Sequence, residues 1–127
     1  VLELKCNRED FNMQYQVHQI RLTEAEVDKI NAEGHNSVES HKMKLDMSFS
    51  EDASAIAKSA FDKGYYTHVS NITTTKGLEG VFETGNIGPE ENIERLAPMH
   101  SVSVGDIVVC PKGKKHLVAS VGFQEVA

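Results

Sequence analysis

The hydrophobic and polar positions along the chain divide it into strands and helices. Residues 13–22 alternate and then change face, which predicts a strand with an irregularity. Residues 43–49 place Met and Leu or Phe at every second position, which predicts a second, half-buried strand. Aromatic and β-branched residues over 65–73 predict a third strand. Residues 1–12 indicate only a short strand or a loose N-terminal arm.

The first predicted helix begins at a capping box, Thr23-Glu-Ala-Glu26, in which the threonine oxygen and the glutamate each accept a free amide hydrogen of the first turn. Gly34 is placed to end this helix. We expect Val27 and Ile30 to face the core. The polar residues 35–41 then predict a loop.

A second helix is expected after Ser50, because apolar residues follow it at helical spacing. A third is expected from Thr74 or Thr75 to about Gly85, weakened by Gly77 and Gly80. A fourth is expected from Pro89 to Pro98, since proline is favoured at a first helical position. The residues expected to face inward are Ala53, Ile56, Ala57, Ala60 and Phe61, then Leu78, Val81 and Phe82, then Ile93 and Leu96.

The last quarter of the chain predicts a β-hairpin. Residues 101–110 and 116–123 are β-patterned and are joined by a Gly-Lys turn, with Gly105-Asp106 as a bulge or turn inside the first run. A hairpin requires antiparallel pairing, so the fold class is α+β. We expect one domain over residues 1–127, with a curved, mainly antiparallel sheet or small open barrel and three or four short helices packed on one side.

Composition narrows the function classes. The 127 residues carry 13 basic and 19 acidic side chains, and a formal charge of -6 argues against sequence-independent binding of nucleic acid. No apolar run reaches the length of a membrane helix, so no membrane contact is expected. Cys6 and Cys110 stand far apart, which favours neither a disulfide framework nor zinc. A cytoplasmic protein without a cofactor is the resulting expectation.

Six histidines raise the question of a metal site, but no pair has the spacing of ligands on one helix. Three of them, His18, His68 and His116, fall in predicted strands, where suitable registers would bring them together. Independent histidines are the favoured interpretation, and no metal is expected.

A catalytic interpretation would use His100, Ser101, Ser103 and Asp106, which lie close together in the sequence. No strained serine turn of the GxSxG type accompanies them. Solvent-facing serines and a Gly-Asp turn explain the same residues, so no residue is assigned a catalytic role.

The run Ser101-Val-Ser-Val-Gly-Asp-Ile-Val, the Gly113-Lys114 turn and the closing Val-Gly-Phe123 resemble the C-terminal signature of small uncharacterised proteins of tailed bacteriophages and mobile elements. The preceding Leu78–Thr84 and Asn86 also fit, with Gly80 and Gly85 as departures. The resemblance implies life in the cytoplasm of an infected bacterium and a role in binding a host or viral component. It assigns no activity.

Three functions follow as hypotheses. The first is a non-enzymatic interaction module of the phage accessory type, since no complete catalytic constellation is present. The second is an RNA- or single-stranded-DNA-binding small barrel. The third is a small hydrolase or nucleotide-modifying enzyme using His100, Asp106 and a strand histidine. An exposed sheet edge favours a homodimer. The residues expected at the interaction surface are His100, Ser101, Ser103, Asp106, Lys112, Lys114, Lys115, Tyr65 and Tyr66.

Overall fold

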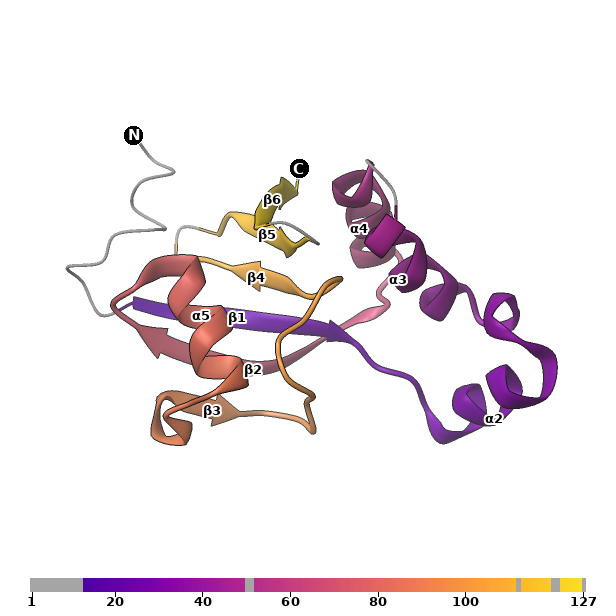
Figure 1. Cartoon of the computed structure of the whole chain (residues 1–127), viewed down its shortest axis with the longest axis horizontal. Helices are drawn as coiled ribbons and strands as arrows, with labels where there is room; N and C mark the ends of the chain where they lie inside the picture. Colours follow the sequence, from indigo (N-terminus) through magenta and orange to yellow (C-terminus); the bar gives the residue numbers. More distant parts are fainter. Residues whose placement is uncertain (1–12, 50–51, 112, 120–121, 127) are drawn as a thin grey trace.

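The computed structural model describes residues 13–49, 52–111, 113–119 and 122–126 (Figure 1). Within them the protein is α+β, as predicted, with four α-helices and one six-stranded sheet. The expectation for residues 1–12 and the expected N-cap Ser50 fall outside the described residues, as does Lys112.

All neighbouring strands of the sheet are antiparallel. Their order is β3-β2-β1-β4-β5-β6, so β3 and β6 are outer strands and the sheet does not close into a barrel. The expected irregularity is present, because the pairing of β1 with β2 shifts register between Val17 and His18. The strands are β1 Met13–Ile20, β2 Tyr66–Thr74, β3 Ile93–Arg95, β4 Ile107–Val109, β5 Lys115–Val118 and β6 Phe123–Val126.

In chain order, the helices and short 3-10 turns come mostly between β1 and β2. They are α2 Glu24–Glu33, η1 His35–Ser37, α3 Glu39–Phe49, α4 Ala53–Asp62, α5 Gly77–Asn86 and η2 Glu90–Asn92. We call α2, η1 and α3 the helical arm. Figure 1 shows α2 at the outer end of this arm, away from the sheet.

Two buried clusters hold the fold together, one on each face of the sheet. Leu78 and Val81 of α5 pack with Tyr15, Val17 and other residues on one face. The alanines of α4 pack with Ile20, Ile107 and Leu117 on the other face. Since neighbouring residues of a strand point to opposite faces, Val108 and Ile107 enter different clusters. The helices therefore contact both faces, and the expectation that they pack on one side is wrong in this respect.

The predicted stripe of α4 is confirmed. Ala53, Ala57 and Ala60 are buried, and Ile56 and Phe61 pack against the same cluster. Gly64 follows the helix at φ 78°, a backbone conformation that favours glycine.

Helix α5 is also present, and its glycines have a packing role. A Cβ on Gly85 would meet the Val102 side chain, with Val102 Cβ at 3.1 Å. A Cβ on Gly80 would lie 2.7 Å from Lys76 Cβ and still closer to Thr74 Oγ1. These two glycines thus let α5 approach its neighbours closely. Phe82, expected to face inward, is 43% exposed.

The strand prediction for 43–49 is wrong, because these residues belong to α3. Met, Lys, Leu and Asp or Ser alternate there, but Met, Lys and Leu are also strong helix formers. Over seven residues the two periods are hard to separate. The loop predicted over 35–41 is likewise replaced, by η1 and the start of α3.

Three further details differ from expectation. The segment after Pro89 forms η2 and the short strand β3 instead of a helix, and Leu96 is 51% exposed. The first hairpin strand begins only at Ile107. The hairpin itself is present as β4 paired with β5.

Cys110 is buried and disulfide-bonded, which the wide spacing of the cysteines did not predict. Among the described residues, no helix is long and apolar enough to span a membrane.

Candidate functional site

A cleft of about 390 Å³ lies where the end of β1, helix α3 and the segment 100–104 meet. Apolar and basic side chains share its wall. The residues that line it are Ile20, Arg21, Leu22, His41, Lys44, Leu45, Ser48, His100 and Val104.

Helix α3 supplies one wall through a single stripe. His41, Lys44, Leu45 and Ser48 stand at i, i+3, i+4 and i+7, which are neighbours on one helix face. The same residues would have been split between two faces of a strand. The site therefore depends on the helix that the alternation pattern concealed.

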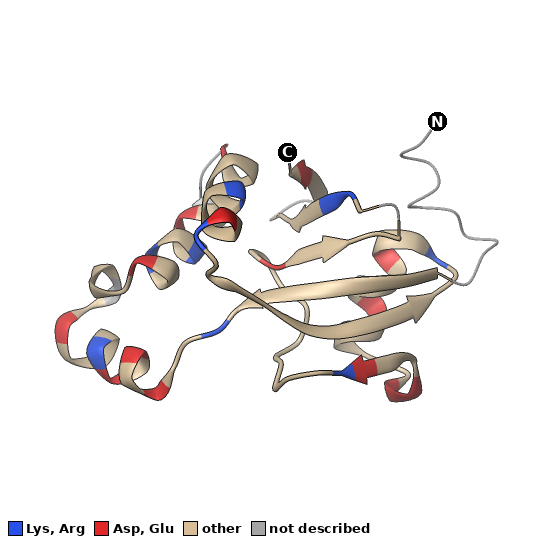
Figure 2. Cartoon of the chain, turned by 180° about the vertical axis from the view of Figure 1, so that it is seen from behind, with Lys and Arg blue, Asp and Glu red and all other residues tan. Residues whose placement is uncertain are grey.

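The cleft is basic although the whole chain is acidic. Arg21, His41, Lys44 and His100 line it, and none of the described lining residues is Asp or Glu. The formal charge of the chain is -6. Figure 2 shows basic positions both on the connection between β1 and α2 and on α3. Arg21 belongs to the first of these segments and Lys44 to the second. A locally positive, partly apolar cleft attracts anionic groups in spite of the opposite overall charge.

His100 is oriented by two contacts. Its Nδ1 lies 2.8 Å from the carbonyl oxygen of Ser101, which can only accept a hydrogen bond, so Nδ1 carries the proton. Its Nε2 lies 3.4 Å from Lys44 Nζ and accepts from that ammonium group. The pair joins the segment after β3 to α3 across the cleft.

Buried Gln19 fastens this segment to β1. Its amide Nε2 donates to the His100 carbonyl at 2.9 Å and to Asp106 Oδ2 at 3.0 Å. Its Oε1 accepts from the His100 backbone amide at 3.2 Å. One fully buried amide side chain therefore sets the backbone position of His100 and holds the carboxylate behind the cleft.

Asp106 is the buried acid of the site. Burial raises the pKa of Asp106 from its ordinary 3.8 to about 6, opposed by the hydrogen bond from the Ser103 amide and by nearby His100 and Lys44. The Ser103 amide donates to Oδ2 at 2.9 Å. Oδ1 is buried without a hydrogen-bond partner among the described residues. The expected turn at Gly105-Asp106 is confirmed, with Gly105 at φ 95°.

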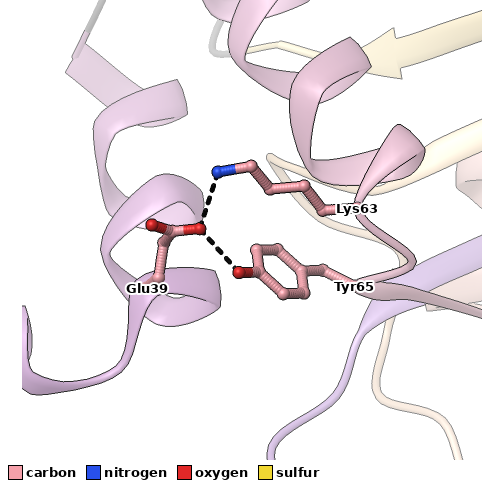
Figure 3. A network of polar contacts seen from close by, with 3 residues as sticks. All are labelled: Glu39, Lys63 and Tyr65. Carbon is pink, nitrogen blue, oxygen red and sulfur yellow. Dashed lines mark hydrogen bonds and ion pairs between the residues drawn. The ribbon is translucent and has the colours of Figure 1, made fainter.

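The two tyrosines assigned to the interaction surface have internal partners. The Tyr66 hydroxyl donates to the Gly105 carbonyl at 2.6 Å, and burial, followed by Asp106, raises the pKa of Tyr66. The Tyr65 hydroxyl donates to Glu39 Oε1 at 2.6 Å, and Lys63 Nζ lies 2.8 Å from the same oxygen (Figure 3). Their hydroxyls tie β2 to the turn before β4 and to the start of α3.

The turn lysines lie outside the cleft lining. Lys114 forms an ion pair with Glu125 at 3.6 Å, and Lys115 Nζ sits 5.1 Å from the centre of the Phe61 ring. They belong to the β5–β6 side of the sheet and are separate from the cleft that His100 lines.

The strand histidines meet only in part. His18 and His68 stack with ring centres 4.8 Å apart, whereas His116 is buried opposite Val108, on the other sheet face. Burial, then His68 and Lys115, lowers the pKa of His18 to about 4. No group of three potential metal ligands occurs among the described residues.

The structure thus brings His100 and Asp106 into one neighbourhood, with Ser101 exposed and Ser103 contributing its backbone amide. Sequence reasoning missed Arg21, His41, Lys44 and Gln19. The spacing of residues 41, 44, 45 and 48 was the available signal for α3. Comparisons with protein-family models, curated proteins and solved structures gave no match.

Proposed function

We propose that the chain is a non-enzymatic interaction module whose cleft binds an acidic segment of a protein partner. The observation that carries the proposal is the lining itself, which combines four basic and four apolar side chains. The basic residues are Arg21, His41, Lys44 and His100, and the apolar residues are Ile20, Leu22, Leu45 and Val104.

This combination suits a peptide better than a free ion. An apolar lining favours burial of an aliphatic side chain of the peptide, while a few polar groups fix the orientation of the bound peptide. Basic groups in the lining speed association with an acidic partner and disfavour a basic one. A carboxylate near Lys44 would receive charge-assisted hydrogen bonds, which are stronger than neutral ones.

The other two hypotheses receive less support. A nucleic-acid surface built on Lys112, Lys114, Lys115 and the tyrosine pair would use Tyr65 and Tyr66 for stacking, yet both hydroxyls are engaged internally. A hydrolase would use His100 and Asp106, and it is favoured by the presence of both His41 and His100 in the lining of one cleft. Asp106, however, is fully buried and contacts Gln19.

We further propose a phage or mobile-element origin and a cytoplasmic location in an infected bacterium. The C-terminal run Ser101–Phe123 supports the origin through its resemblance to such proteins. The disulfide at Cys110 weighs against the location, because such bonds are rare in cytosolic proteins.

An NMR titration of the labelled chain with octaglutamate tests the function. We expect shifts in the side-chain signals of His41 and His100, and about tenfold weaker binding in Lys44→Gln, equivalent to about 1.4 kcal/mol. Lys58→Gln is the matched control, because Lys58 pairs with Asp62 on α4 and does not line the cleft.

An oligonucleotide titration and an ester-turnover assay distinguish the nucleic-acid and hydrolase hypotheses from the proposed module. A thymidine oligonucleotide that binds more tightly than octaglutamate would favour the nucleic-acid hypothesis. Turnover of p-nitrophenyl acetate that Lys44→Gln or His100→Gln abolishes would favour the hydrolase. Absence of octaglutamate binding, or equal loss in Lys58→Gln, would reject the proposed module.

A further inference from the structure

Helix α2 is well formed but has no buried residue. Its capping box has both hydrogen bonds, from the Glu26 amide to Thr23 Oγ1 at 3.1 Å and from the Thr23 amide to Glu26 Oε1 at 2.9 Å. All ten residues of α2 lie in the described part of the chain, and none of them is buried. An isolated helix of this length is marginal in water, so packing against a partner would stabilise it.

One ridge of α2 has a distinct chemistry. Glu24, Val27, Ile30 and Glu33 recur every three residues and so follow one ridge along the helix. Val27 is 41% exposed and Ile30 is half-buried. The helix carries four acidic residues and one lysine, a net charge of -3 (one minus four). The ridge therefore presents an aliphatic pair with a carboxylate at each end.

This ridge is complementary to the cleft described above. The cleft is lined by apolar and basic side chains, and its 390 Å³ suits aliphatic side chains rather than a whole helix. A helix that lays residues i and i+3 into an apolar groove is a common mode of peptide recognition. Val27 and Ile30 would be the anchors, and Glu24 and Glu33 would approach the basic side chains of the cleft.

The helix of the same chain is badly placed to fill its own cleft. Arg21 and Leu22 line the cleft, and the N-cap Thr23 follows them directly. From there α2 runs to the outer end of the arm (Figure 1). The acidic ridge is therefore available to another molecule.

We propose that α2 of a second copy docks in the cleft, and that two copies do so reciprocally in a two-fold dimer. Each copy then offers one acidic helix and one basic cleft, the self-complementary arrangement that a two-fold interface requires. The inference rests on the proposed function, for which it names the partner: the acidic segment is this chain's own α2.

Sedimentation velocity over a wide concentration range, with charge-swapped variants, tests the dimer. We expect the unmodified chain to reach twice the monomer mass as concentration rises. Lys44→Glu alone should weaken the dimer at least tenfold, and so should Glu24→Lys combined with Glu33→Lys. An equimolar mixture of these two variants should dimerise again, because each helix then faces a cleft of opposite charge.

Controls keep folding separate from docking. Lys58→Glu, on α4 outside the cleft, should dimerise like the unmodified chain. Circular dichroism should show the same helix content in every variant. A mixture that stays monomeric, or single variants that dimerise normally, would overturn the inference.

The proposed function and the proposed dimer can be rejected independently of each other. A chain that remains monomeric at the highest concentration but binds octaglutamate through Lys44 would reject only the dimer. A chain that neither dimerises nor binds octaglutamate would reject both.

Discussion

The helical arm differs in side-chain burial from the region formed by the sheet and α5. In the first region, side chains such as Tyr15, Val81 and Leu117 are fully buried. In the arm, none of the residues of α2, all of them described, is buried, and α3 is only partly buried, with Met47 in the core beside α4 and Leu45 36% exposed. Packing therefore stabilises the sheet region and one side of α3, whereas local propensity and capping stabilise α2.

The contrast explains where the sequence was informative. Burial selects a pattern that matches the element, as in the stripe of α4 and the alternation of β1. Residues 43–49 suggest the wrong period because Met43 and Met47, which pack in the core of the fold, are four residues apart and fit a strand face as well as a helix stripe. Leu45, between them, is 36% exposed and completes the apparent alternation.

The largest expected difference is between core and arm truncations. Leu117→Ala should lower the free energy of unfolding by about 2–5 kcal/mol, because it leaves a cavity beside Ile107. Val27→Ala should change it by less than about 0.5 kcal/mol. Urea denaturation at low protein concentration, where any dimer is absent, measures both. Equal losses would show that the arm is part of the same packed core.

The buried carboxyl group of Asp106 should change the free energy of unfolding by up to about 3 kcal/mol as the pH changes. As pH rises from 3.8 to about 6, the unfolded chain loses the Asp106 proton while the folded chain keeps it, so stability falls. Asp106→Asn should remove this fall. Because His18 has its pKa lowered to about 4 and acts in the opposite direction, the variant is compared with the unmodified chain at each pH.

Thermal or urea unfolding at pH 4 and pH 7 measures the change. We expect the stability of Asp106→Asn relative to the unmodified chain to rise between these values. Two curves that run parallel would mean that Asp106 is ionised in the fold at an ordinary pKa.

Gly85→Ala should have a smaller effect on the free energy of unfolding. We expect it to lower this free energy, whereas helix propensity alone would raise it. The substitution favours an exposed helix by up to about 1 kcal/mol. In α5 the new methyl group meets Val102, so we expect a loss of about 1–3 kcal/mol. Asn31→Ala on exposed α2 is the matched control and should gain a few tenths of a kcal/mol. A gain in both variants would contradict the close packing of α5.

Much of the fold was predictable from the sequence. The α+β class, β1, β2, α4, α5, the capping box of α2 and the Gly105 turn all have local signals. Strand β3 is only three residues long, so its local strand signal was weaker than the helix-start signal of Pro89. The exposure of Phe82 and Leu96 was not readable, since an apolar residue on a surface looks like one in a core.

Less of the site was predictable. His100 and Asp106 were singled out because they are close in sequence, but their link through Gln19 spans more than eighty positions, 81 to His100 and 87 to Asp106. Arg21 and Lys44 join the cleft only when β1 and α3 meet. Such contacts depend on tertiary packing, which the spacing of residues along one element does not contain.

The pairing of β1 with β2 has a consequence for how the chain assembles. These strands are neighbours in the sheet, with Met13 opposite Thr74 and Ile20 opposite Tyr66, yet the arm and α4 lie between them. No tight turn can set their register, so the buried side chains must do so. Loop-closure entropy grows only with the logarithm of loop length, by about 0.6 kcal/mol per doubling. A long helical insertion within what would otherwise be a hairpin is therefore tolerated at little thermodynamic cost.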